Sequence, residues 1–159
     1  MSFNELLISP FAYAPPAHVL EDLSDAEAVR RLDGAPHTVA ELVAHLSFWQ
    51  EWFLDRCRSA ATPMADHAAA GWPGAPPGSW DETRVRFLAG LRQAAAMGAK
   101  IDRLGQPLSP AIEFPPLSHY TVHDALTHIA VHNAHHLGQV VVLRQMIGRW
   151  PPPAGSWTW

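Results

Sequence analysis

The side chains best suited to chemistry in this sequence are histidines, and half of them lie close together. The chain contains 10 histidines. Five of these fall within fourteen consecutive residues, namely His123, His128, His132, His135 and His136. Neutral imidazole is the commonest side-chain ligand for divalent transition metals. The enrichment therefore indicates a metal site on the segment that carries these residues.

The spacing of His132 and His136 suits one shared ion. Residues i and i+4 of a helix point to the same side and are about 6 Å apart along its axis. Two imidazoles at that spacing can converge on an ion at about 2.0–2.1 Å. A third ligand must come from another helix, and His45 borders the apolar face of an earlier helical segment. We therefore predict a divalent metal held by His45, His132 and His136.

The other histidines of this segment compete for the same role. The pair His128/His132 is the alternative, but each i, i+4 step drifts by about 40° around the helix. The ladder of His128, His132 and His136 therefore cannot face one ion equally, and we expect His128 and His135 to flank the site. Asn133 stands where a His-Glu-x-x-His peptidase carries its general base. This difference disfavours peptidase chemistry.

Several neighbours of these histidines have two interpretations. Gln139 can bond a ligand histidine or serve in packing. Glu41 and Asp124 lie one turn before His45 and His128 and could orient an imidazole, although solvated helix surface is the simpler expectation. The aromatic pair Trp49 and Trp52 can line a pocket mouth or belong to the core.

Helical periodicity organises most of the chain, and proline or glycine separates the segments. The first segment, residues 9–20, is interrupted by prolines and should be kinked or broken. A capping box predicts a short helix over residues 24–32. Longer helices are predicted over residues 38–58, 79–101 and 121–148. In the first two, a Ser or Thr at the start is followed three residues later by a glutamate, which is the pattern of a capping box.

The last helix is predicted to bury a stripe whose steps alternate between three and four residues. Its members are Val122, Ala125, Ile129, His132, His136, Gln139, Leu143 and Met146. Buried polar groups without partners cost about 1–3 kcal/mol each, so the polar interruption of an apolar seam requires a reason. A metal provides one.

These elements predict an all-α fold, a four-helix bundle with long connections and a Pro/Trp-rich C-terminal tail. The 159 residues fit one domain, residues 1–159. We expect the tail to pack back on the bundle, because an exposed tryptophan pair at Trp157 and Trp159 would be a costly apolar patch.

Composition excludes several classes of function. The net charge is −4 and the longest basic run is Arg30-Arg31, so neither nucleic acid nor an anionic membrane is an expected partner. No apolar run spans a bilayer and no signal peptide begins the chain, which leads us to expect a cytoplasmic protein. The one cysteine, Cys57, lies about 18 Å along the helix from His45. We expect it to be a small buried hydrophobe.

The sequence resembles the DinB/YfiT-like family of metalloenzymes. The resemblance rests on "ELVAHLSFWQEWF" around His45 and on "HIAVHNAHHLGQ" from His128 to Gln139, and it covers nearly the whole chain. It implies a four-helix bundle in which a histidine of the second helix and a His-x-x-x-His pair of the fourth bind a metal. By position these are His45, His132 and His136. The prolines of the first segment depart from the family pattern.

The resemblance implies a class of activity. Members include S-transferases that use low-molecular-weight thiols and a thiol-dependent maleylpyruvate isomerase. The leading hypothesis is therefore a thiol S-transferase acting on small electrophiles, with zinc or nickel as the ion. A metal-dependent hydrolase and a non-catalytic metal- or haem-binding bundle are the alternatives. A small-molecule substrate, a low-molecular-weight thiol and a second copy in a homodimer are the expected partners.

Overall fold

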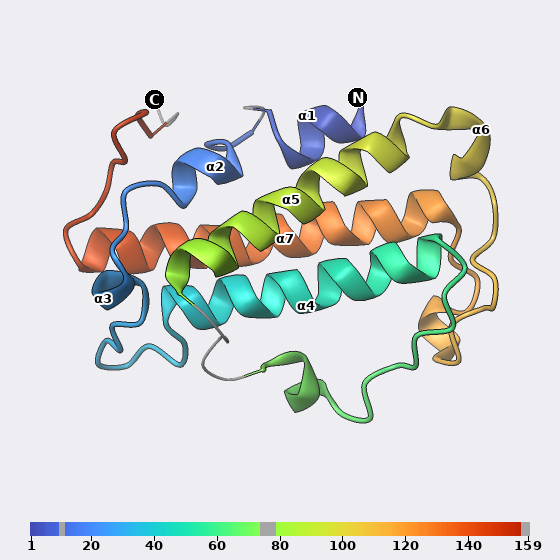
Figure 1. Cartoon of the computed structure of the whole chain (residues 1–159), viewed down its shortest axis with the longest axis horizontal. Coiled ribbons are helices and arrows are strands. Elements are labelled where there is room, and N and C mark those ends of the chain that lie inside the picture. The colour runs from blue at the N-terminus through green and yellow to red at the C-terminus, as the bar shows by residue number, and fades with distance from the viewer. Residues whose placement is uncertain (10–11, 74–78, 157–159) are drawn as a thin grey trace.

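Three long α-helices form the centre of the molecule (Figure 1). The computed structural model describes residues 1–9, 12–73 and 79–156. The long helices are α4 (Val39–Cys57), α5 (Trp80–Gly98) and α7 (Val122–Met146). α4 packs against both α5 and α7. The described residues contain no strand, only an isolated bridge between Pro107 and Thr121, so the predicted all-α class is confirmed.

Capping boxes set where the long helices begin, as predicted for α4 and α5; the structure shows a third box at the start of α7. In each box a Ser or Thr side chain accepts a hydrogen bond from the backbone N–H three residues on, and the acidic side chain there accepts from the cap backbone N–H. The pairs are Thr38/Glu41, Ser79/Glu82 and Thr121/Asp124. Each pair satisfies backbone groups that the first helical turn leaves without partners.

The N-terminal segment is broken, one of the two outcomes predicted for residues 9–20, and its first helix begins earlier than predicted. It forms two short helices, α1 (Phe3–Leu7) and α2 (Pro16–Val19). Pro15 is the N-cap of α2 and Pro16 its first residue, because proline fits the first turn but interrupts a helix that arrives from the N-terminal side. α1 contacts α5 and α7, and α2 contacts α7.

Short elements occupy the connections. The predicted capping box at Ser24 opens α3 (Asp25–Ala28), which is shorter than the predicted helix over residues 24–32. The loop between α4 and α5 contains the 3-10 helix η1 (Ala68–Gly71). α6 (Ile101–Leu104) and the 3-10 helix η2 (Pro115–Leu117) lie between α5 and α7.

α5 ends three residues earlier than predicted. Its last residue is Gly98, whereas the predicted helix extended to Ile101. The side chain of Ile101 is 80% exposed and therefore does not belong to the buried face of α5.

The buried face of α7 also differs from the predicted stripe. Gln139 is exposed and Met146 is 56% exposed, so neither lies in the core. The buried residues of this helix are Val122, Ala125, Leu126, Ile129, Ala130, Asn133, Leu137, Val140, Leu143 and Arg144. His132 and His136 lie half-buried beside this face, at the edge of the α4–α7 seam.

A buried amide pair connects the three long helices. The Gln50 side chain of α4 donates to the backbone carbonyl of Phe87 in α5 at 3.0 Å. The Gln50 Oε1 atom accepts from Asn133 Nδ2 of α7 at 3.1 Å. Both amides are almost fully buried, and a hydrogen bond in the low-dielectric core has strict geometry. The pair therefore fixes how the three helices lie along one another.

Arg144 connects the end of α7 to α2 and to the C-terminal tail that follows α7. Its buried guanidinium donates to the backbone carbonyls of Val19 and Arg149. In the tail, the Ala154 N–H donates to a Glu21 carboxylate oxygen. The tail thus packs against the α2 region up to the last described residue, and the predicted packing of Trp157 and Trp159 lies outside the described residues.

Among the described residues, no helix combines the length and the apolar character needed to cross a bilayer.

Replacing Gly90 by alanine should show how rigidly the side chains of Gln50 and Asn133 are held. A Cβ at Gly90 would lie 2.0 Å from Gln50 Nε2, so we expect G90A to lower the free energy of unfolding by about 1–3 kcal/mol in urea titrations. In a Q50A background the clash is gone, and G90A should instead stabilise by up to about 1 kcal/mol through helix propensity.

The matched control is G138A in α7. No atom lies within 4 Å of a Cβ built at Gly138, so this variant should be neutral or stabilising. An equal effect of G90A with and without Gln50 would contradict the assigned role of the pair.

Candidate metal centre

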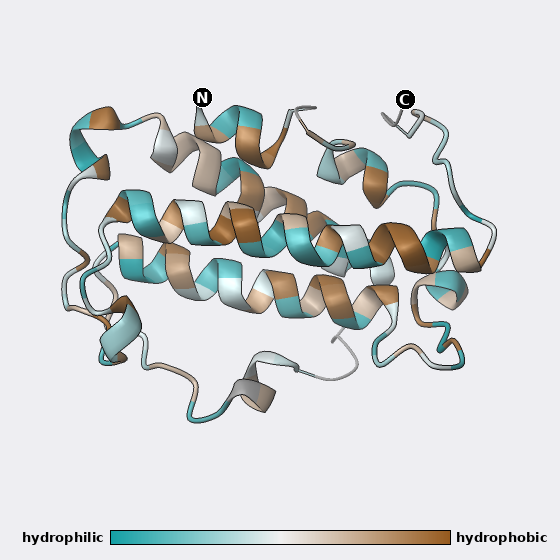
Figure 2. Ribbon diagram, turned by 180° about the vertical axis from the view of Figure 1, so that it is seen from behind, coloured by the Kyte–Doolittle hydropathy of each residue, from teal (hydrophilic) through white to brown (hydrophobic). Residues whose placement is uncertain are grey.

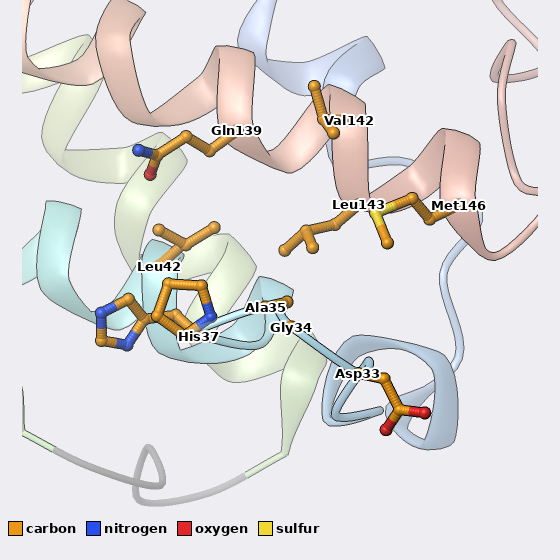
Figure 3. Close-up of a pocket in the computed structure, with 10 residues that line it drawn as sticks. Asp33, Gly34, Ala35, His37, Leu42, Gln139, Val142, Leu143 and Met146 are labelled. Atoms are coloured by element: carbon orange, nitrogen blue, oxygen red, sulfur yellow. The ribbon is translucent and has the colours of Figure 1, made fainter.

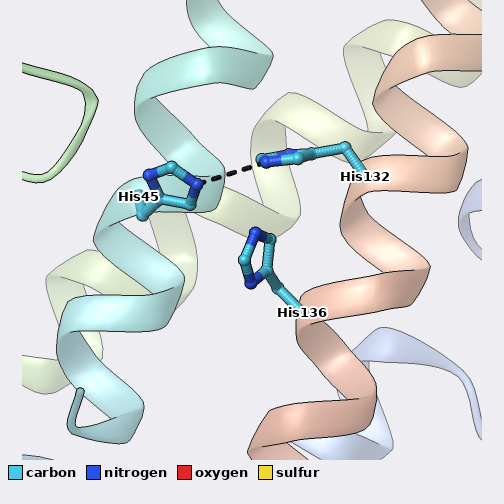
Figure 4. Close-up of side chains that lie close together, drawn as sticks. All are labelled: His45, His132 and His136. Carbon is cyan, nitrogen blue, oxygen red and sulfur yellow. Dashed lines mark hydrogen bonds between the residues drawn. The ribbon is translucent and has the colours of Figure 1, made fainter. Parts of the chain in front are cut away.

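Three imidazoles from two helices meet at one point (Figure 4). His45 comes from α4, and His132 and His136 come from α7. The Nε2 atoms of His45 and His132 are 3.2 Å apart. One nitrogen of each ring lies within 4.8 Å of the corresponding nitrogens of the other two. The structure thus brings together the three residues that the sequence analysis selected.

The separation of the nitrogens fits an ion between them. Two nitrogens bound at 2.0–2.1 Å to one tetrahedral zinc lie about 3.3–3.4 Å apart, close to the 3.2 Å between His45 and His132. Imidazoles also suit nickel, copper and iron. The three-histidine group can therefore hold a divalent metal ion, and the geometry does not select which one.

Hydrogen bonds on the far side of two rings direct their lone pairs inward. His45 Nδ1 donates to the backbone carbonyl of Gly71 at 2.6 Å, and His136 Nδ1 donates to Gln139 Oε1 at 2.8 Å. Both acceptors are carbonyl oxygens, so the proton resides on Nδ1 in each ring. This leaves each Nε2 with a free lone pair, which is the tautomer that a metal requires.

Burial keeps these imidazoles neutral. His45 is 5% exposed, and desolvation lowers its pKa below the usual 6.5. Desolvation likewise lowers the pKa of His136. For His132, desolvation and then the neighbouring imidazoles lower the pKa to about 3. Neutral rings bind a metal without first losing a proton.

The α4–α5 loop supplies an aromatic support that sequence reasoning missed. Trp72 stacks on the ring of His45, with centroids 3.7 Å apart and an angle of 8° between the planes. It also stacks on His37 with the same separation and angle. Together with the Gly71 carbonyl, this stack fixes the ring plane of His45.

Gly71 reaches His45 because it has no side chain. A Cβ at this position would lie 2.4 Å from Nε1 of Trp49. The sequence signal for this support was only a tryptophan beside a glycine within a loop, and nothing local indicated that it returns to α4.

The flanking histidines lie outside the cluster, as predicted. His128 packs against Phe53 and its Nδ1 lies 3.1 Å from the hydroxyl oxygen of Tyr120. Its ring centroid is 6.2 Å from that of His132. His135 is exposed, and its Nε2 is 3.5 Å from Gln139 Nε2.

The remaining candidates have structural roles. Glu41 and Asp124 are the acidic members of capping boxes and form no hydrogen bond with an imidazole of the cluster in the described structure. Trp52 is buried and donates to the Pro63 carbonyl, whereas Trp49 is half-buried beside Gly71. Cys57 is buried, which raises the pKa of its thiol to about 11, in agreement with an inert core residue.

An open pocket of about 550 Å³ adjoins the cluster. It is lined by Tyr120, Asp124, Thr127, His128, Val131, His132 and His135. Because His132 forms part of its wall, a small molecule in this pocket would be close to an ion held by the three histidines. Sequence reasoning did not identify Tyr120 as part of this region.

Comparison with known proteins gives one family match. The sequence profile described as the DinB superfamily matches residues 17–140, a range that includes all three histidines of the cluster. No curated protein and no solved structure matches the chain.

Alanine variants should separate ligands from neighbours. We expect the purified chain to bind a single zinc or nickel ion, and H45A, H132A and H136A each to lose it in elemental analysis after dialysis. H135A is the matched control, because His135 contacts the ring of His136 but lies outside the cluster. Equal metal content in H132A and H135A would rule out this centre.

The support given by Gln139 should be measurable in the metal affinity. Q139L removes the acceptor of the His136 Nδ1 proton, so we expect metal affinity to fall by about 10–100-fold in competition titrations with a chromogenic chelator. Q145L, at another exposed glutamine of α7, should leave the affinity unchanged. If both variants bind equally well, Gln139 does not orient His136.

Proposed function

The chain belongs to the DinB superfamily, and we propose that it is a metal-dependent enzyme that transfers a low-molecular-weight thiol to a small electrophile. The observation that carries the proposal is the convergence of three neutral imidazoles within 4.8 Å. Three protein ligands leave further coordination positions for a small molecule, which is the arrangement of catalytic rather than structural metal sites.

The protein residues would bind and orient, and the ion would supply the chemistry. A zinc or nickel ion bound by His45, His132 and His136 would favour the thiolate form of a nearby thiol. The thiolate sulfur would form a bond to an electrophilic carbon, the leaving group would depart with its bonding electrons, and the thiol proton would pass to solvent.

The open pocket beside His132 is where we place the thiol. Tyr120, Thr127 and His128 line it with hydrogen-bonding groups, which suits a polar low-molecular-weight thiol. His128 is held in place by Phe53 and by its contact with Tyr120. These side chains would position the thiol and need not act as a general base.

We also propose that the helices correspond to a four-helix bundle. α4, α5 and α7 would be three of its helices, and α1 with α2 would together take the place of the fourth. The contacts of α1 with α5 and α7, and of α2 with α7, support this interpretation. A homodimer remains a prediction from the family resemblance.

Turnover assays can test the reaction. Zinc- or nickel-loaded protein is incubated with a chromogenic electrophile and a panel of low-molecular-weight thiols. We expect a rate above background with at least one thiol, loss of that rate in H132A, and retention in H123A, at an exposed histidine of α7 outside both the cluster and this pocket. Activity on ester or amide substrates without any thiol would favour the hydrolase instead. Metal binding without turnover under either condition would leave a non-catalytic metal-binding protein as the function.

A further inference from the structure

A second pocket lies on the other side of the histidine cluster along α7 (Figure 3). Its volume is about 360 Å³. It is formed by the loop before α4, one residue of α4 and the C-terminal half of α7. The lining residues are Asp33, Gly34, Ala35, Pro36, His37, Leu42, Gln139, Val142, Leu143 and Met146.

The polar end of this pocket is formed by residues next to the metal centre. Gln139 lines the pocket and accepts the hydrogen bond from His136. His37 also lines it and stacks on Trp72, whose other face covers His45. The pocket therefore begins at the residues that support two of the three cluster histidines.

Apart from the exposed Asp33, the rest of the pocket is apolar. Leu42 and Leu143 belong to the buried core and provide its inner surface. Val142 and Met146 are 52% and 56% exposed, and Figure 2 colours much of the C-terminal half of α7 as hydrophobic. Exposed apolar surface beside a polar site is typical of a ligand-binding region.

We propose that this pocket, called here the Leu42–Met146 pocket, binds the apolar part of the electrophilic substrate. The inference rests on the proposed function, because it places the reactive end of the same molecule at the metal centre. A volume near the lower end of the usual range of ligand pockets suits a short alkyl chain or a single aromatic ring. The polar thiol and the apolar electrophile would thus approach the ion from two different pockets.

The side chains that line the two pockets support this division. The pocket beside His132 presents hydroxyl and imidazole groups, whereas the Leu42–Met146 pocket presents four large apolar side chains beyond its polar entrance. Hydrophobic transfer would draw an apolar group into the second pocket, and Gln139 and His37 would face the polar atoms that join it to the reactive carbon.

A homologous series of metal-binding probes tests the proposal. Zinc-loaded protein is titrated calorimetrically with acetohydroxamate, butanohydroxamate, hexanohydroxamate and octanohydroxamate, whose common head group binds the ion. We expect affinity to rise by about fourfold per added methylene, until the alkyl chain fills the pocket and the increase stops.

Surface variants locate the alkyl chain. V142D and M146D place a carboxylate on the rim of the Leu42–Met146 pocket and should abolish the chain-length dependence while leaving acetohydroxamate binding unchanged. V131D changes the pocket beside His132, and V85D changes α5 at a valine of similar exposure. Both V131D and V85D should keep the dependence of affinity on alkyl-chain length.

The outcomes separate this inference from the proposed function. Equal affinities across the series, or loss of the dependence in V131D but not in V142D, would overturn the inference while leaving the metal centre intact. Protein that takes up no metal and binds no hydroxamate would overturn both. A normal chain-length dependence without thiol-dependent turnover would support the pocket and contradict the transferase reaction.

Discussion

The position of α4 relative to α7 along their axes is the constraint on which the histidine cluster depends. A slip of one helical turn would move His45 by about 5.4 Å, more than the 4.8 Å within which all three ligand nitrogens lie. Apolar side chains alone tolerate such slips, but the buried hydrogen bond between Gln50 and Asn133 does not. Asn133 directly follows His132 in the chain. The buried pair of Gln50 and Asn133 therefore sets the geometry of the histidine cluster at the edge of the core.

Much of this arrangement could be predicted because it is encoded locally. The capping pairs at Thr38 and Ser79 predicted where α4 and α5 begin, since a cap and its partner are only three residues apart. The four-residue spacing of His132 and His136 predicted that their side chains share one side of α7. These inferences require no knowledge of tertiary structure.

The parts that failed depend on contacts between distant segments. The stripe chosen for α7 placed Gln139 and Met146 in the core, but the buried stripe runs through Asn133 and Leu137. The two stripes differ by a small rotation of the helix, and a sequence with valine and alanine on several sides cannot distinguish them. Likewise, the support of His45 by Gly71 and Trp72 arises from a loop 26 residues away, and no local pattern specifies its path.

The edge of the seam is a better place for a reactive metal than the centre that the predicted stripe implied. At the centre, packed core side chains would enclose the ion and no substrate could reach it. On an open surface, the imidazoles would be solvated and protonated more readily, and loose rings would bind weakly. At the edge, burial on the α4 side lowers the pKa of His132 and His45, while pockets adjoin the cluster from two directions along α7. Sequence periodicity could not resolve the small rotation of α7. This rotation places the neutral histidines at the edge of the core, where an ion that they held would be accessible to a substrate.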